Sequence, residues 1–294
     1  MKLISRMLLP LALLAPGGSA RAGSYVVLQA LGENSLVRVS ADGKSVTTVA
    51  RGISGIALAI DAAGNYVVAS TSSISRVSAG GAVTHLADAP GGSEWADVAV
   101  SPDGTILAAD ALRPSVWRIS PDGTSKKEMT YPNDIVLPPG AHRWASLSVE
   151  PDGGFVLLIG GWDYAVGAVA RFYRFAPGGE VKEIPLHGPR TRHPVALTPD
   201  GSGNYFFANE EFSGPSGGTP ILRLTATGSV SNFAEMRVLL PVRMVRDPET
   251  GIIAVSDSDP ARLLFLRPED GSVVATVSFK GLARPVALVW DPHN

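Results

Sequence analysis

Several polar side chains that could bind a ligand or a metal ion stand at the ends of apolar segments. Asp110, Asn209 and Asp257 each end a short run of mainly apolar residues. Their side-chain oxygens can either hydrogen-bond the loop that follows or contact a ligand. Asp257 and Asp259 also offer two carboxylates to a hard cation such as Ca²⁺. The residues alone leave these interpretations open, so a divalent metal is an expectation and no cofactor is certain.

A second group of residues near such segment ends combines charge with aromatic rings. It comprises Asp97, Arg143, Trp144, Trp162, Asp163 and Tyr164. A polar pocket with aromatic walls suits a small polar ligand or a peptide segment. We therefore predict that this group, together with Asp110, Asn209 and Asp257, binds a small polar ligand, a peptide or a protein.

The elements that position these residues follow from an internal repeat. Six segments resembling apolar-x-Arg-apolar run into a glycine turn: SLVRVSADG, SISRVSAGG, SVWRISPDG, RFYRFAPGG, ILRLTATG and LLFLRPEDG. Their turn glycines, which lie 38 to 56 residues apart, are Gly43, Gly81, Gly123, Gly179, Gly228 and Gly271. This spacing is typical of a β-propeller with one four-stranded blade per repeat.

A second repeat alternates with the first and completes each blade. Segments such as VAVSPDGTILAAD and LSVEPDGGFVLLIG place a turn between two apolar strands. An Asp-Gly turn between apolar runs favours a β-hairpin, since glycine accepts positive φ without a Cβ clash. Each repeat therefore holds two hairpins, with strands A, B, C and D counted outward from the channel. We interpret Asp103, Asp152 and Asp200 as turn residues.

A column of arginines recurs on the predicted C strands. Its members are Arg38, Arg76, Arg118, Arg174 and Arg223, and Phe265 takes the place of the sixth. A ligand site would rarely need the same residue in five radially separated places. We therefore expect a structural role, either pairing with an acid of the adjacent blade or packing the side-chain stem on apolar surface.

The two chain ends predict how the ring closes. Residues 285–292 look like a strand A without a strand B, and Tyr25–Leu28 look like a strand B without a strand A. Pairing them makes one composite blade and removes the free sheet edges. We predict an all-β, six-bladed β-propeller with four-stranded blades, formed as one domain by residues 23–294.

Propeller topology sorts the loops onto two faces. The A–B and C–D hairpins lie on one, the hairpin face. The B–C loops and D-to-A connections lie on the other, the loop-rich face, which carries long insertions at 130–142, 160–170 and 209–220. Long loops on a rigid scaffold commonly carry function. We therefore expect the binding pocket at the channel mouth of the loop-rich face.

Residues 1–22 predict a cleavable signal peptide. Lys2 and Arg6 precede an apolar stretch, Met7–Ala15, and Ala20-Arg-Ala22 matches the small-x-small cleavage pattern. The chain has no cysteine, which suits a bacterial periplasm or secretion without disulfides. Net charge is −2 with no basic block, so nucleic acid is excluded as an expected partner. We expect no membrane span in the mature chain and a monomeric state.

The pattern G-I-A-x-x-x-D-x-x-G-N-x-x-V-A, from Gly55 to Ala69, resembles the NHL repeat. The blades also resemble virginiamycin B lyase-like propellers and the gluconolactonase, or senescence-marker, group. The gluconolactonase resemblance implies a divalent metal held by Asn and Asp at the starts of strands A. Here those positions hold Ile56, Ala96, Ala145, His193, Val242 and Val286, of which only His193 could ligate a metal.

The lyase-like resemblance implies a histidine and acids at the channel mouth. His193 with Glu210 or Glu211 matches this as general base and acid, with Arg192 stabilising an oxyanion. The family's W-F-T-E strand end reads Phe206-Phe-Ala-Asn209 here, and His193 has a structural alternative as a hydrogen-bonded loop residue. NHL-type propellers without a preserved active site commonly bind a peptide or a protein. We predict such a binding module, with a propeller hydrolase or lyase as the alternative.

Overall fold

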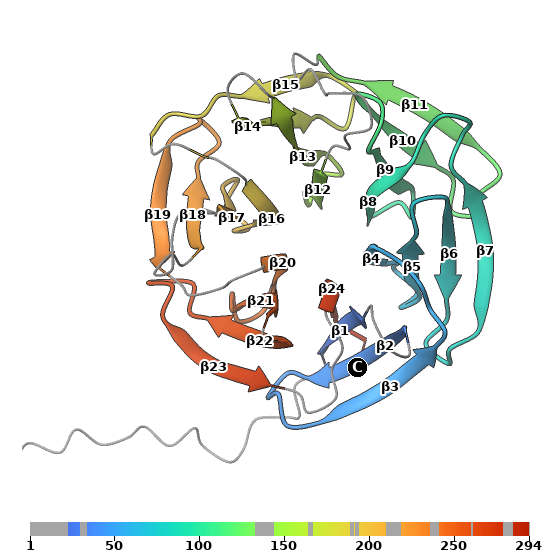
Figure 1. Ribbon diagram of the computed structural model, residues 1–294, viewed down its shortest axis with the longest axis horizontal. Coiled ribbons are helices and arrows are strands. Elements are labelled where there is room, and N and C mark those ends of the chain that lie inside the picture. The colour runs from blue at the N-terminus through green and yellow to red at the C-terminus, as the bar shows by residue number, and fades with distance from the viewer. Residues whose placement is uncertain are drawn as a thin grey trace, which may run out of the picture.

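The computed structural model describes residues 23–29, 34–132, 144–163, 167–188, 191, 194–209, 219–235, 241–259, 261–278 and 285–293. Within these ranges the chain forms 24 β-strands and no α-helix, arranged as six four-stranded antiparallel sheets. The sheets surround a common centre, as Figure 1 shows. The predicted six-bladed β-propeller is confirmed. None of the described elements is an apolar helix long enough to cross a membrane.

The blades are numbered in chain order from the one that holds both ends of the fold. Blade one contains β24 (Pro285–Asp291), β1 (Ser24–Gln29), β2 (Ser35–Ser40) and β3 (Val46–Arg51). Blade two contains β4 (Ala57–Ile60), β5 (Tyr66–Ala69), β6 (Ser73–Val77) and β7 (Val83–Asp88). Blade three contains β8 (Trp95–Val100), β9 (Ile106–Asp110), β10 (Ser115–Ile119) and β11 (Lys126–Thr130).

The second half of the ring repeats this order. Blade four contains β12 (Trp144–Val149), β13 (Phe155–Asp163), β14 (Gly167–Phe175) and β15 (Val181–Ile184). Blade five contains β16 (Pro194–Pro199), β17 (Tyr205–Asn209), β18 (Pro220–Leu224) and β19 (Val230–Glu235). Blade six contains β20 (Pro241–Arg246), β21 (Ile253–Ser258), β22 (Ala261–Leu266) and β23 (Val273–Ser278).

The ring closes where the sequence predicts. β24 pairs antiparallel with β1, with Tyr25 opposite Trp290 and Val27 opposite Leu288. The six innermost strands β24, β4, β8, β12, β16 and β20 contact one another in turn around the channel. Blades three and six are therefore three steps apart in either direction and face each other across the centre (Figure 1).

The turns between strands C and D require glycine, as the repeat predicts. All six predicted turn glycines have positive φ, between 69° and 94°. At Gly123 a second reason applies, because a β-carbon there would lie 2.1 Å from the carbonyl oxygen of Leu86 in blade two. Glycine at this position therefore permits both the turn and the close approach of the neighbouring blade.

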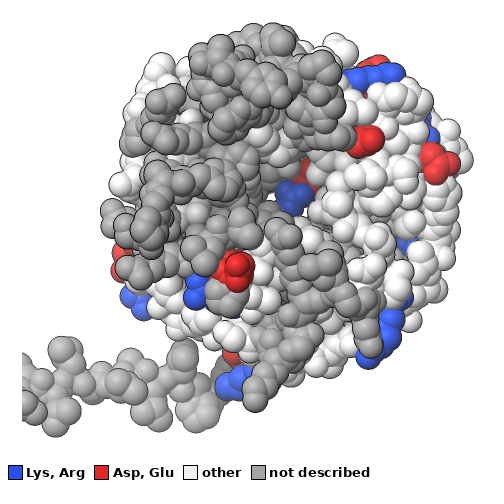
Figure 2. All heavy atoms as spheres, in the orientation of Figure 1, with Lys and Arg blue, Asp and Glu red and all other residues white. Residues whose placement is uncertain are grey.

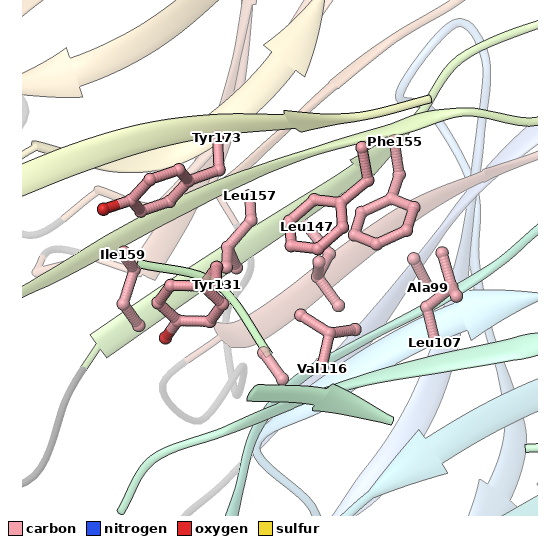
Figure 3. Close-up of a cluster of buried hydrophobic side chains, with 11 residues drawn as sticks. Ala99, Leu107, Val116, Tyr131, Leu147, Phe155, Leu157, Ile159 and Tyr173 are labelled. Carbon is pink, nitrogen blue, oxygen red and sulfur yellow. The ribbon is translucent and has the colours of Figure 1, made fainter. Parts of the chain in front are cut away.

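The hydrophobic core lies between the blades. Six clusters of buried side chains each draw on two neighbouring blades. Figure 3 shows the cluster between blades three and four, where Leu107 and Val116 meet Leu147, Leu157 and Ile159. In the same cluster the rings of Phe155 and Phe175 stack at 4.3 Å. This packing fixes each innermost strand against the next and so makes the channel wall rigid.

The arginine column has a structural role, but its partners differ in part from the prediction. The acid belongs to the same blade as the arginine, so the prediction of an acid from the adjacent blade is wrong. Arg174 pairs with Glu150 at 2.7 Å, while Tyr205 of blade five donates its hydroxyl to Glu150. Likewise Arg38 and Tyr66 of blade two both bind Asp291 of blade one. The adjacent blade thus contributes a tyrosine that ties two blades to one acid.

One predicted turn residue proves to occupy a different position. Pro199 lies opposite Tyr205, just as Ile60 lies opposite Tyr66, so Asp200 is equivalent to Asp61 rather than to Asp103 or Asp152. The cause is a β-bulge in β16 at Ala196, whose φ is +57°. Burial opposes the ionisation of Asp200. Hydrogen bonds from Asn204, Ser202 and Arg223 nevertheless hold its pKa well below the ordinary range.

The inter-blade tyrosines predict a specific alkaline behaviour. Burial, followed by the hydrogen bond to Asp291, raises the pKa of Tyr66 from 10 to about 12. The folded state therefore holds this proton more tightly than the unfolded state. The stability that this provides is complete below pH 10 and is lost as the pH rises toward 12. We expect Tyr66→Phe to be less stable than the wild type at pH 8 by about 1 kcal/mol. That deficit should shrink between pH 10 and pH 12 in urea unfolding. A deficit that stays constant over this range contradicts the assignment.

Candidate functional site

The residues predicted for acid–base catalysis lie outside the described part of the chain. These are Arg192, His193, Glu210 and Glu211, and the binding candidates Arg143 and Tyr164 lie outside it too. Trp162 and Asp163 belong to β13, where they pair with Ala168 and Gly167 of β14. The B–C hairpin of blade four thus extends beyond the usual strand length on the loop-rich side. The roles predicted for all these residues stay predictions.

Asp97 lies at the centre of the channel. It follows a β-bulge between Trp95 and Asp97, and bulges re-aim side chains. Its side chain is 1% exposed. One carboxylate oxygen accepts from the backbone N–H of Val98, and the other accepts from the N–H of Leu147 at 2.6 Å. Since Leu147 belongs to blade four, Asp97 caps the free edge of the neighbouring innermost strand.

Arg243 reaches Asp97 from the opposite side of the ring. It follows a β-bulge of β20, and its guanidinium binds both carboxylate oxygens of Asp97. The same guanidinium donates to the hydroxyl of Ser146 at 3.0 Å. The equivalent positions of the other innermost strands hold small residues: Ala57, Ser146, Ala196 and Ala287. These small side chains leave room for the arginine to cross the channel.

The resulting group, Asp97, Arg243 and Ser146, is called the channel bridge. Ser146 also accepts from the backbone N–H of Leu197 at 3.0 Å, so the bridge joins blades three, four, five and six. Burial raises the pKa of Asp97, while Arg243 and the two backbone N–H groups oppose that rise. In Figure 2 the central hollow shows blue beside red. The bridge therefore spans the channel from blade six to blade three.

The polar residues at the ends of strands B are buried, and Asp110 and Asp257 bind neighbouring parts of the chain. Asp110 accepts from the backbone N–H groups of Leu112 and Arg113, which caps the B–C loop. Asp257 binds Arg262 of the next strand at 2.9 Å. Asn209 ends β17 opposite Pro194 and is 1% exposed. The calcium site predicted at Asp257 stays a prediction, and the described residues contain no cluster of three or more metal-ligating side chains.

Trp144 packs within the channel wall. Its Nε1 donates to the carbonyl of Pro194 in blade five at 3.0 Å. Its ring covers Gly160, where a β-carbon would lie 2.2 Å from the indole. The half-buried ring therefore joins two blades at the start of their innermost strands. Its polar atom is satisfied within the protein.

The described cavity lies on the face opposite to the one predicted. It measures about 610 Å³ and is lined by the ends of the six innermost strands and by the A–B turns. It therefore opens at the hairpin face, with Arg243 at its floor. A cavity between equivalent strand ends carries no sequence motif, because it depends on all six repeats at once. The pocket predicted at the loop-rich face stays a prediction.

Comparison with known proteins identifies relatives of the fold. No protein-family model matches the chain, and no curated protein matches it by sequence. A solved nidogen–laminin complex is 14% identical with a TM-score of 0.70, over 92% of this chain and 99% of that chain. A gluconolactonase from Xanthomonas campestris is 14% identical with a TM-score of 0.63, over 94% of this chain and 98% of that chain.

A third solved structure is that of an inactive virginiamycin B lyase from Staphylococcus aureus with quinupristin. It is 16% identical with a TM-score of 0.56, over 88% of this chain and 85% of that chain. The predicted resemblance to lyase-like and gluconolactonase-like propellers is therefore confirmed for the fold. At such low identities the similarity shows the fold alone, and function depends on the site.

Proposed function

We propose that this chain is an exported propeller that binds a small polar ligand or a protein segment at its loop-rich face. The channel bridge is the observation that carries this proposal. It places a buried ion pair across the centre of the ring, where Figure 2 shows a hollow. Such a hollow can seat a ligand group or a side chain, while the long loops around it supply specificity.

The bonding of the described polar residues favours binding over catalysis. A general acid or base must exchange a proton with a substrate within hydrogen-bond reach. Asp97 is bound to Arg243 and to two backbone N–H groups, and Asp257 is bound to Arg262. Both carboxylates are buried, and their hydrogen bonds go to these partners. They therefore shape and charge the site rather than transfer protons.

Different observations support the export of the protein and the class of its partner. Lys2, Arg6 and the apolar stretch that follows support a signal peptide, and hence a periplasmic or secreted protein. The similar nidogen propeller occurs in a complex with laminin, which supports a protein partner for this architecture. Aromatic residues dominate binding hot spots, so Trp162 and Tyr164 are the proposed anchors.

The test is a pull-down from periplasmic extract with the mature chain, residues 23–294, as bait. The double variant Trp162→Ala/Tyr164→Ala should lose at least about 90% of the captured partner, because hot-spot truncation costs about 2 kcal/mol or more. Val83→Ala and Val273→Ala are the matched controls, since both side chains are about half exposed on outer strands. They should retain the partner. Undiminished capture by the double variant would contradict the proposal. So would a turnover that His193→Ala abolishes in a folded protein.

A further inference from the structure

The cavity of the hairpin face is a funnel built from successive rings of equivalent residues. The ring next to the channel bridge holds Leu58, Val98, Leu147, Leu197, Met244 and Leu288. The outermost ring, in the A–B turns, holds Ala62, Pro102, Pro151, Gly201, Pro248 and Pro292. Both rings lack charged side chains. Apolar side chains therefore form most of the wall of the funnel, although Asp61, Glu150 and Arg243 also line it.

A ring between these two is apolar in every blade except one. Its members are Ile60, Val100, Val149, Pro199, Arg246 and Trp290. Arg246 is thus a single cation among five apolar side chains at the same depth. Nothing in the fold requires an arginine there, because five other blades build the same position with an apolar residue.

The Arg246 guanidinium lies at the mouth of the funnel, between the turns of blades five and six. A β-carbon at Gly201 would lie 3.1 Å from its Nη1, and one at Gly251 would lie 3.3 Å from its Nη2. Within the described residues, no hydrogen bond or ion pair holds this guanidinium. Its planar N–H donors therefore remain available to a ligand in the cavity.

The acids around the mouth do not neutralise Arg246. Asp61 pairs with Arg76 at 3.1 Å, and Glu150 pairs with Arg174 at 2.7 Å. Asp247 follows Arg246 directly, but its carboxylate accepts from the N–H of Glu249 and the hydroxyl of Thr250. Each of these carboxylates thus has partners other than Arg246. Arg246 is thus the lining cation that these acids leave unpaired, above walls made mainly of apolar side chains.

We propose that this funnel is a second binding site and that it takes a small amphipathic carboxylate. The apolar body of the ligand lies against the leucine and valine rings, and its carboxylate binds Arg246. The volume of about 610 Å³ lies in the range of about 300–1,000 Å³ that small-molecule sites occupy. Arg243 of the channel bridge lies at its floor, and the site opens at the hairpin face rather than at the loop-rich face. It therefore stands independently of the proposed function.

The test uses 8-anilinonaphthalene-1-sulfonate, an apolar anion that fluoresces when it enters a dry site, as reporter. Octanoate, 1-octanol and octylammonium serve as competitors that share one apolar body and differ in charge. Octanoate should displace the reporter from the wild type at a concentration at least about tenfold below that of octylammonium. A charge-assisted hydrogen bond accounts for a difference of this size.

The variant Arg246→Gln should weaken the binding of both octanoate and the reporter about tenfold or more. The affinity for 1-octanol should stay unchanged. Arg267→Gln is the matched control, since Arg267 lies in the same blade, is 54% exposed and does not line the funnel. Pro102→Glu adds a carboxylate at the mouth and leaves Arg246 in place. It should weaken the binding of octanoate. Equal affinities for the three competitors would overturn the proposal. So would unchanged octanoate binding in folded Arg246→Gln, or no reporter binding to the wild type.

Discussion

Arg243→Met is expected to lower the free energy of unfolding by about 3–5 kcal/mol, because it leaves the buried Asp97 carboxylate without its counter-charge. The side chains of Asp97 and Arg243 are 1% and 12% exposed, so solvent cannot replace the lost partner. The variant also removes a donor to Ser146 and so unlinks blade six from blades three and four. Urea unfolding at pH 8 measures the loss.

The pH dependence of this loss distinguishes an ionic effect from a packing effect. Burial already raises the pKa of Asp97, and removing Arg243 removes the main opposing influence. A carboxyl whose folded pKa lies above its unfolded value destabilises the fold as the pH rises through that window. The deficit of Arg243→Met should therefore be small near pH 4 and complete at pH 8. A deficit independent of pH would assign the effect to lost packing.

A double variant tests whether the two charges act as a pair. Asp97→Leu/Arg243→Met replaces both charges by apolar groups, and such replacements of buried pairs are often neutral or stabilising. It should recover most of the stability that the single variant loses. Arg267→Met, which removes an exposed pair with Asp270 at 3.8 Å, is the control and should change stability by less than about 1 kcal/mol. A double variant as unstable as Arg243→Met would show that the bridge is not an interacting unit.

The blades and the closure of the ring could be predicted because their signals are local and repeated. Each turn glycine lies between two strands in which apolar and polar residues alternate. Its positive φ would bring a β-carbon into a clash with the backbone, so the turn favours glycine. The composite blade followed from a strand without a partner at each end. The arginine column was also recognisable, but its partner was not, because the choice between the same and the adjacent blade depends on side-chain direction. Asp200 does belong to the turn, but its equivalence to Asp61 could not be predicted, since the bulge at Ala196 leaves no mark in the Thr-Pro-Asp-Gly pattern.

The channel bridge could not be predicted in the same way, since Asp97 and Arg243 lie 146 residues apart. A signal for it nevertheless exists in the aligned repeats. At one position of strand A, four blades hold Ala or Ser, and the two remaining blades, three steps apart, hold opposite charges. The same comparison of the six strands A shows that Arg246 occupies a position that is apolar in the other five blades. A position at which one or two blades differ in residue type from the other blades thus indicates a side chain with a role beyond forming the blade.

Ring closure leads to the second large effect: a chain shortened after residue 284 should not fold as a cooperative monomer. β24 covers the inner edge of β1, every residue of which is buried. Its Trp290 packs edge-on against Tyr25 at 4.8 Å, and its Asp291 binds Arg38 and Tyr66. Burying Leu288 and Trp290 contributes about 1.5–3 kcal/mol each, and each ladder hydrogen bond about 1 kcal/mol. Their sum is comparable to the whole stability of a domain, about 5–15 kcal/mol.

The shortened chain also allows closure to be restored from outside. With β24 absent, β1 presents an open edge, which should make the protein self-associate in size-exclusion chromatography. A peptide of residues 284–294 should pair with that edge by strand addition, return the protein to a monomer and restore a cooperative unfolding transition. A peptide with Trp290→Ala and Asp291→Asn should do so at least about tenfold less well. If the shortened chain instead unfolds cooperatively as a monomer at the wild-type temperature, the pairing of the two ends is not what holds the six blades in a ring.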